Sequence, residues 1–298
     1  MNQPVHVQRR SRCESPEPIR NPARFRTAIL AILMSSLSLW MYSDLQRYPC
    51  EHAFSHQIDS PVLALELASS RAEVERVLAP RCAAYQAISD PKRRGESYEN
   101  ARQTAHDVLL RNTIADCFFI PLYTSFIWSF GSLFAGNANS LLRRVLTLAT
   151  ILTAAADYTE NIGIFRSLRS GPSDLLAQWT CWPSQFKWIV LALALSLTGV
   201  TLLRSQEILY SLATRRLLAL AYLAAGTLLV IGVWLPVLIG LGLSVFGVIV
   251  AVQIVALLGP YVADRFPPDK VVYEENFCKD REKSRKALAV HEDASQET

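Results

Sequence analysis

Leu217–Ala263 reads LLALAYLAAGTLLVIGVWLPVLIGLGLSVFGVIVAVQIVALLGPYVA and contains no charged residue. A single helix of this length would be about 70 Å long, which is enough for two crossings of a hydrocarbon core about 30 Å thick. Proline interrupts helices, so Trp234-Leu235-Pro236 is the expected place for the chain to reverse. The stretch therefore predicts two membrane-spanning helices.

Four shorter apolar stretches precede this one, and with it they predict an all-α, polytopic helical membrane bundle of about six transmembrane helices. Charged residues make up 19% of the chain and hydrophobic residues 51%, whereas a soluble domain carries roughly 25% charged residues. We therefore expect the lipid bilayer as partner. No basic patch with interleaved aromatic residues occurs, so no nucleic-acid partner is expected, and the sequence indicates no particular protein partner. The four stretches lie between Arg26 and Asp44, Arg111 and Arg143, Arg144 and about Phe165, and Lys187 and Arg204.

Charge distribution predicts how these parts are arranged about the membrane. Arginines are dense before the first stretch and recur at Arg143-Arg144, so the positive-inside rule places both termini in the cytoplasm. Lys187 is expected at the outer end of the fourth span. The first stretch is expected to be a retained anchor rather than a signal peptide, since no small-x-small cleavage site follows it. The expected parts are a cytoplasmic basic tail (1–26), a transmembrane helix (27–43), an external helical domain (44–107), a five-helix bundle (108–263) and a cytoplasmic charged tail (264–298).

The external segment contains a helix signal. Ser70-Arg71-Ala72-Glu73 has the form of a capping box, and Val74, Val77 and Leu78 follow at helical spacing. A short amphipathic helix is expected there, either on the outer leaflet or packed against the rest of the external domain. Asp90–Gly95 is expected to be a solvated turn.

Three acidic residues occur inside predicted spans. A charge at the centre of a membrane helix costs about 2.5–3.5 kcal/mol on insertion scales, so each acid needs a partner or a function. Counting 1.5 Å per residue from the ends of the two spans places Asp116, Asp157 and Glu160 at a similar depth near the outer leaflet.

Helical spacing predicts which side chains face each other. Asp157, Glu160 and Asn161 share one face of the third span, and Asp116 and Tyr123 share a face of the second. We therefore expect these five residues to meet across an interface. Pro121, between Asp116 and Tyr123, is expected to kink its helix or to free backbone carbonyl groups.

Three functions are compatible with these residues. The leading hypothesis is a site that binds a cation, a proton or a small polar ligand, with a divalent cation as the cofactor it would imply. The alternative is a structural or interaction membrane protein whose acids only fix helix packing. A third is an intramembrane metal-dependent enzyme that activates water. The sequence leaves open whether the chain is an enzyme.

Weaker signals lie elsewhere in the chain. His52 and His56 are four residues apart, as ligands of a metal ion can be, but no further defined ligand accompanies them. Cys50 could pair with Cys82 or with Cys181, or these cysteines could be free thiols. Gly240-x-x-x-Ser244 and Gly247-x-x-x-Ala251 have the spacing of small residues that allow close contact between helices.

The order of several elements resembles an uncharacterised family of bacterial polytopic membrane proteins. The elements are Leu65-Glu66-Leu67-Ala68 with Arg71-Ala72, then D-x-x-F-x-x-x-Y at Asp116–Tyr123, then D-x-x-E-N at Asp157–Asn161. The resemblance covers about residues 58–165 and departs after Leu78, where Pro80-Arg81 replaces an expected aromatic residue. It implies a bacterial inner (plasma) membrane location and groups the acids with the external helix, but it implies no activity.

Overall fold

The computed structural model describes residues 22–49, 60–78, 89–135, 140–205 and 212–265. Within these ranges the chain is all-α and has no strand. The elements are α1 (Pro22–Leu45), α2 (Pro61–Glu66), α3 (Arg71–Leu78), α5 (Pro91–Ala135), α6 (Ser140–Ser170), α7 (Asp174–Arg204), α8 (Leu212–Gly232) and α9 (Val237–Arg265). The helices between Ala23 and Leu257 belong to one compact unit.

In the described part of the chain, five helices are long and apolar enough to cross a membrane: α1, α5, α7, α8 and α9. They fit a multi-pass integral membrane protein. The third predicted span corresponds to α6, which is not among the five; it carries arginines near both ends and two acids in between. A total of six spans therefore requires α6 to be counted.

The connection between α8 and α9 lies where the sequence predicts it. α8 ends at Gly232 and α9 begins at Val237, so the chain reverses at Trp234-Leu235-Pro236 as predicted. The predicted turn at Asp90–Gly95 is wrong, because Pro91–Gly95 form the start of α5 and Asp90 directly precedes it. The Asp90 side chain accepts a hydrogen bond from the backbone N–H of Lys92 at 2.9 Å and so caps the first turn. The predicted domain boundary at residue 107 lies inside this continuous 45-residue helix.

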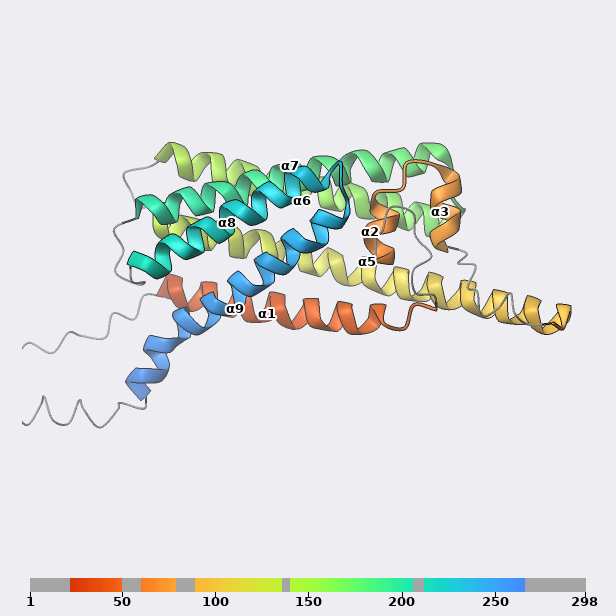
Figure 1. Ribbon diagram of the computed structural model, residues 1–298, viewed down its shortest axis with the longest axis horizontal. Coiled ribbons are helices and arrows are strands. Elements are labelled where there is room, and N and C mark those ends of the chain that lie inside the picture. Colours follow the sequence, from red (N-terminus) through yellow and green to blue (C-terminus); the bar gives the residue numbers. More distant parts are fainter. Residues whose placement is uncertain (1–21, 50–59, 79–88, 136–139, 206–211, 266–298) are drawn as a thin grey trace, which may run out of the picture. The chain divides into compact units, whose positions relative to one another are not determined.

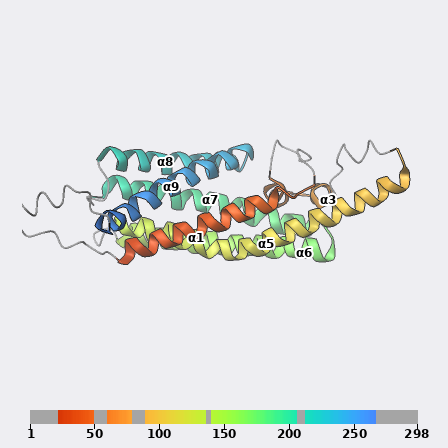
Figure 2. The same ribbon diagram turned by 90° about the horizontal axis from the view of Figure 1, so that it is seen from below.

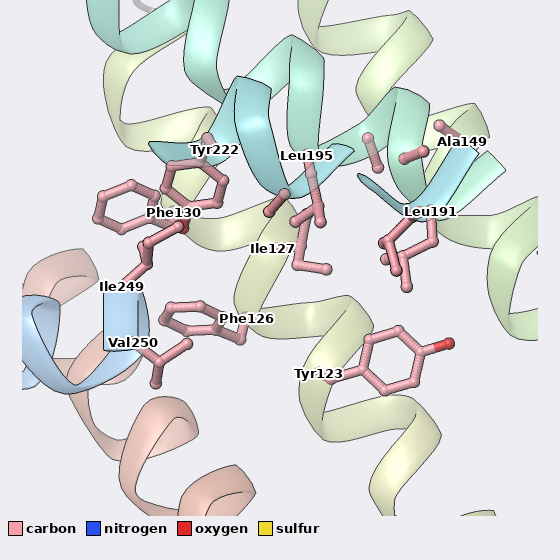
Figure 3. Close-up of a cluster of buried hydrophobic side chains, with 14 of the residues drawn as sticks. Tyr123, Phe126, Ile127, Phe130, Ala149, Leu191, Leu195, Tyr222, Ile249 and Val250 are labelled. Atoms are coloured by element: carbon pink, nitrogen blue, oxygen red, sulfur yellow. The ribbon is translucent and has the colours of Figure 1, made fainter. Parts of the chain in front are cut away.

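The main apolar core lies between α5, α6, α7, α8 and α9. Phe126, Phe130 and Tyr222 are fully buried in it, and the rings of Phe130 and Tyr222 stack with centroids 5.9 Å apart. Figure 3 shows Tyr123 at the edge of this cluster, with its hydroxyl oxygen directed away from Phe126. The apolar core therefore ends at Tyr123, whose hydroxyl group points away from it.

A second, smaller core holds α2 and α3 against one end of the bundle (Figures 1 and 2). Val74 and Val77 of α3 are buried and belong to the same cluster as Leu109 of α5 and Ile164 of α6. The amphipathic helix therefore packs on the long helices. Its capping differs slightly from the prediction: Ser70 Oγ accepts from the Glu73 N–H at 3.4 Å, but the Glu73 carboxylate accepts from the N–H of Ser69 at 2.7 Å.

α1 is joined to α5 by a polar contact. Asp44, 4% exposed, accepts hydrogen bonds from the guanidinium of Arg111 at 3.1 and 3.2 Å and from the Asn112 side chain at 3.0 Å. The two-point contact with Arg111 fixes orientation as well as distance.

Candidate functional site

The candidate site is centred on the ammonium group of Lys187. Its Nζ lies 2.9 Å from Asp157 Oδ1, 2.9 Å from Glu160 Oε2 and 3.1 Å from Glu66 Oε2. All four side chains are buried: the residues are between 0% and 9% exposed. The contributing helices are α2 (Glu66), α6 (Asp157 and Glu160) and α7 (Lys187). We call these four residues the lysine–carboxyl cluster.

Lys187 reaches this position because α7 is longer than the fourth predicted span. The helix begins at Asp174, where Ser173 caps it by accepting from the Leu176 N–H at 3.2 Å, and it runs for 31 residues to Arg204. Lys187 is therefore near its middle. The fourth span is predicted to begin at Lys187, whereas the helix that contains this residue begins at Asp174. The missed signal was that Lys187 is the one charged residue between Leu175 and Leu203.

Glu66 was not predicted as a site residue, although the resemblance included it. It is the last residue of α2, which Ser60 caps and Pro61 begins. Besides Lys187, its Oε2 accepts a long hydrogen bond from Ser184 at 3.5 Å. Burial is the largest influence on the pKa of Glu66 and raises it above the usual value, although the ammonium of Lys187 acts in the opposite direction.

Four of the five predicted residues, Asp116, Tyr123, Asp157 and Asn161, meet at one interface between α5 and α6, whereas Glu160 contacts Lys187 of α7. The Tyr123 hydroxyl donates to Asp157 Oδ2 at 2.6 Å, and Asn161 Nδ2 donates to Asp116 Oδ2 at 2.8 Å. Helical spacing therefore predicted the facing surfaces correctly. Asp157 links this interface to the lysine–carboxyl cluster, because its other oxygen accepts from Lys187.

Pro121 frees a backbone carbonyl group, as expected. A proline at this position cannot donate to the carbonyl of Cys117 four residues earlier. The hydroxyl of Tyr158 on α6 donates to that carbonyl oxygen at 2.9 Å. A third hydrogen bond between α5 and α6 therefore holds the two helices in register beside Asp116 and Asp157.

One oxygen in the cluster retains capacity for a hydrogen bond. Glu160 Oε1 accepts from Lys187 at 3.0 Å. Oε2 lies 2.9 Å from Nζ as an ion-pair contact, and among the described residues no hydrogen bond to this buried oxygen is formed. A buried carboxyl oxygen without a hydrogen bond is costly when the group is ionised.

The remaining predicted residues are two histidines that could bind a metal ion and the cysteines of a possible disulfide. His52, His56, Cys50 and Cys82 lie outside the described residues. Cys181 is a free thiol on α7 and Cys117 a free thiol on α5. In the ranges that the structure describes, no group of three or more His, Cys, Asp or Glu side chains is arranged to hold a metal ion. The cation found beside the acids is the chain's own Lys187.

No family model, curated protein or solved structure matches the chain. The resemblance of residues 58–165 to a bacterial membrane protein family therefore stays a prediction.

Proposed function

We propose that this multi-pass membrane protein binds and releases protons at the lysine–carboxyl cluster. The observation that carries the proposal is the imbalance of charge around Lys187: three carboxyl groups contact a single ammonium group. If all were ionised, two negative charges would stay uncompensated in a buried environment. Such charges are costly, and carboxyl groups can avoid the cost by taking up protons.

Hydrogen bonding supports a specific distribution of these protons. Asp157 accepts from Lys187 on one oxygen and from Tyr123 on the other, which suits the ionised form. Glu160 has a buried oxygen that contacts the ammonium group but accepts no hydrogen bond from any described residue. Glu66 has a raised pKa, chiefly because it is buried. The exchangeable protons are therefore assigned to Glu66 and Glu160, with Asp157 as the permanent counter-ion of Lys187.

A proton is favoured over a divalent cation. Lys187 Nζ already occupies the point where the three carboxyl groups converge. A metal ion there would have to displace an ammonium group that is 4% exposed and close to the ring of Trp188. Proton binding needs no such displacement.

A second candidate function is structural, and one observation favours it. Lys187 connects α7 to α2 and α6, so the cluster could serve only to hold these helices together. Under this alternative the protonation state changes only when the helices separate. Under the proton-binding function it changes while the fold persists.

Trp188 provides the test, because Lys187 Nζ lies 4.6 Å from the centroid of its ring. The emission of Trp188 is obtained as the difference between the native protein and Trp188→Phe. We expect it to change with pH while the helicity stays constant, and we expect a smaller change in Glu160→Gln, which keeps only the exchangeable proton of Glu66. Exposed Glu99→Gln is the matched control. Emission that changes only together with loss of helicity would support the structural function instead.

A further inference from the structure

A cavity of about 800 Å³ lies apart from the lysine–carboxyl cluster, between α3, the first half of α5 and the connection from α6 to α7. Its walls carry three arginines, Arg71, Arg76 and Arg102, and one acid, Glu75. Positive charge is therefore in excess at this surface. We propose that the cavity binds the phosphate group of a phosphate ester, either a phospholipid headgroup or a soluble compound.

The three arginines of the cavity differ in whether they already pair with an acidic side chain. Arg71 donates to Glu75 at 2.6 Å, so this pair is neutral. Arg102 lies 3.8 Å from Glu99, and both side chains are more than half exposed, so the contact is weak. Arg76 makes no ion pair within the described residues and is exposed. Arg76 and Arg102 thus offer two guanidinium groups to a ligand.

Guanidinium groups suit phosphate because their planar array of donors matches two oxygens at once. Tyr98, half-buried at the same cavity, adds a hydroxyl group. His106 is already engaged: its ring nitrogens lie 3.3 Å from the Leu168 carbonyl oxygen and 3.4 Å from Asp107. His106 therefore forms part of the cavity wall, and the arginines are the residues expected to bind the phosphate group.

The volume of the cavity argues for an ester over the bare ion. A cavity of several hundred Å³ accommodates an organic molecule, and one phosphate ion would leave most of it empty. Gly171, with φ of 84°, gives the α6–α7 connection its tight turn at one side of the cavity.

The position of the cavity fits a phospholipid headgroup as the molecule that supplies the phosphate group. Trp179 and Trp182 on α7 are 52% and 71% exposed. Exposed tryptophans mark the level where a membrane meets water. The cavity is lined by Gly171 and Pro172, which precede these tryptophans by roughly two turns of chain, so it lies beyond them on the polar side.

The experiment uses the full-length protein and a double variant, Arg76→Gln with Arg102→Gln. Arg93→Gln with Arg94→Gln is the matched control, since it removes the same charge from α5 outside the cavity. One arm measures the thermal midpoint with glycerol 3-phosphate, using glycerol for comparison. The other arm counts phosphatidylglycerol molecules retained, by native mass spectrometry of protein from phosphatidylglycerol–phosphatidylcholine nanodiscs.

We expect the cavity variant to fold normally and to bind the phosphate ligand about tenfold more weakly or worse, while the control behaves like the native protein. A shift with glycerol 3-phosphate identifies a soluble ester as ligand, and selective loss of retained phosphatidylglycerol identifies a headgroup. The proposal is overturned if the native protein shows neither effect, or if the control variant loses binding equally.

Discussion

The ammonium nitrogen of Lys187 lies 2.9 Å from Oδ1 of Asp157, and both residues are at most 4% exposed. They belong to different helices, α7 and α6, so the pair fixes how the two helices meet. Glu66 and Glu160 contact the same ammonium group, so Lys187 and Asp157 also form the centre of the lysine–carboxyl cluster.

Lys187→Met should destabilise the protein by about 3–5 kcal/mol at neutral pH, because it leaves the buried carboxylate of Asp157 without its cation. Reversible unfolding of the purified protein in mixed micelles measures it. Lys92→Met removes an exposed lysine at the start of α5 and is the control. Equal stability of the two variants would contradict a role for the cluster in holding the helices.

Glu66→Gln should gain stability relative to the native protein as the pH rises. The pKa of Glu66 is raised above 4.5 in the folded state, mainly by burial, so the folded state binds more protons than the unfolded state between these two pKa values. Native stability at this site is therefore greatest below the unfolded pKa and declines as the pH rises toward the folded pKa. Glutamine has the same shape and does not titrate. Unfolding measured from about pH 4 to pH 8 tests this; a difference that is flat or falls with pH would contradict it.

Close packing between α7 and α8 depends on Gly226. A Cβ added there would lie 2.8 Å from the backbone oxygen of Ala192 and 2.5 Å from Ser196 Oγ. Gly226→Ala should therefore cost about 1–3 kcal/mol. At Gly240 a Cβ would meet nothing within 4 Å, so Gly240→Ala should be neutral or stabilising by up to about 1 kcal/mol. Thermal unfolding of both variants measures the contrast, which equal effects would contradict.

These glycines also show where sequence patterns were insufficient. The motifs at Gly240 and Gly247 had the spacing of a helix contact, yet an added Cβ would meet open space at both positions. The glycines at the α7–α8 contact, Gly199 and Gly226, have no small residue four positions before or after them. Spacing within one helix predicts which residues share a face, but not which face a neighbouring helix covers.

The difference between spacing within one helix and packing between helices also explains which site residues could be predicted. The facing of Asp116 and Tyr123 toward Asp157 and Asn161 followed from helical spacing and from the antiparallel direction of two adjacent helices. Glu66 could not be found this way, because α2 has six residues and its place against α7 depends on the tertiary fold. Lys187 was recoverable: a lone charge in a long apolar stretch needs a buried partner, and acids were already predicted on the preceding helix.

The lysine–carboxyl cluster is proposed to hold protons at neutral pH, and infrared spectroscopy of the full-length protein in nanodiscs can detect these protons. A protonated carboxyl group has a C=O stretching band that a carboxylate lacks, and the band shifts in deuterated water. We predict such a band at neutral pH in the native protein and in the exposed control Glu99→Gln, and a weaker band in Glu160→Gln. If the native protein shows only carboxylate bands at neutral pH, the three acids are fully ionised around Lys187 and the account is contradicted.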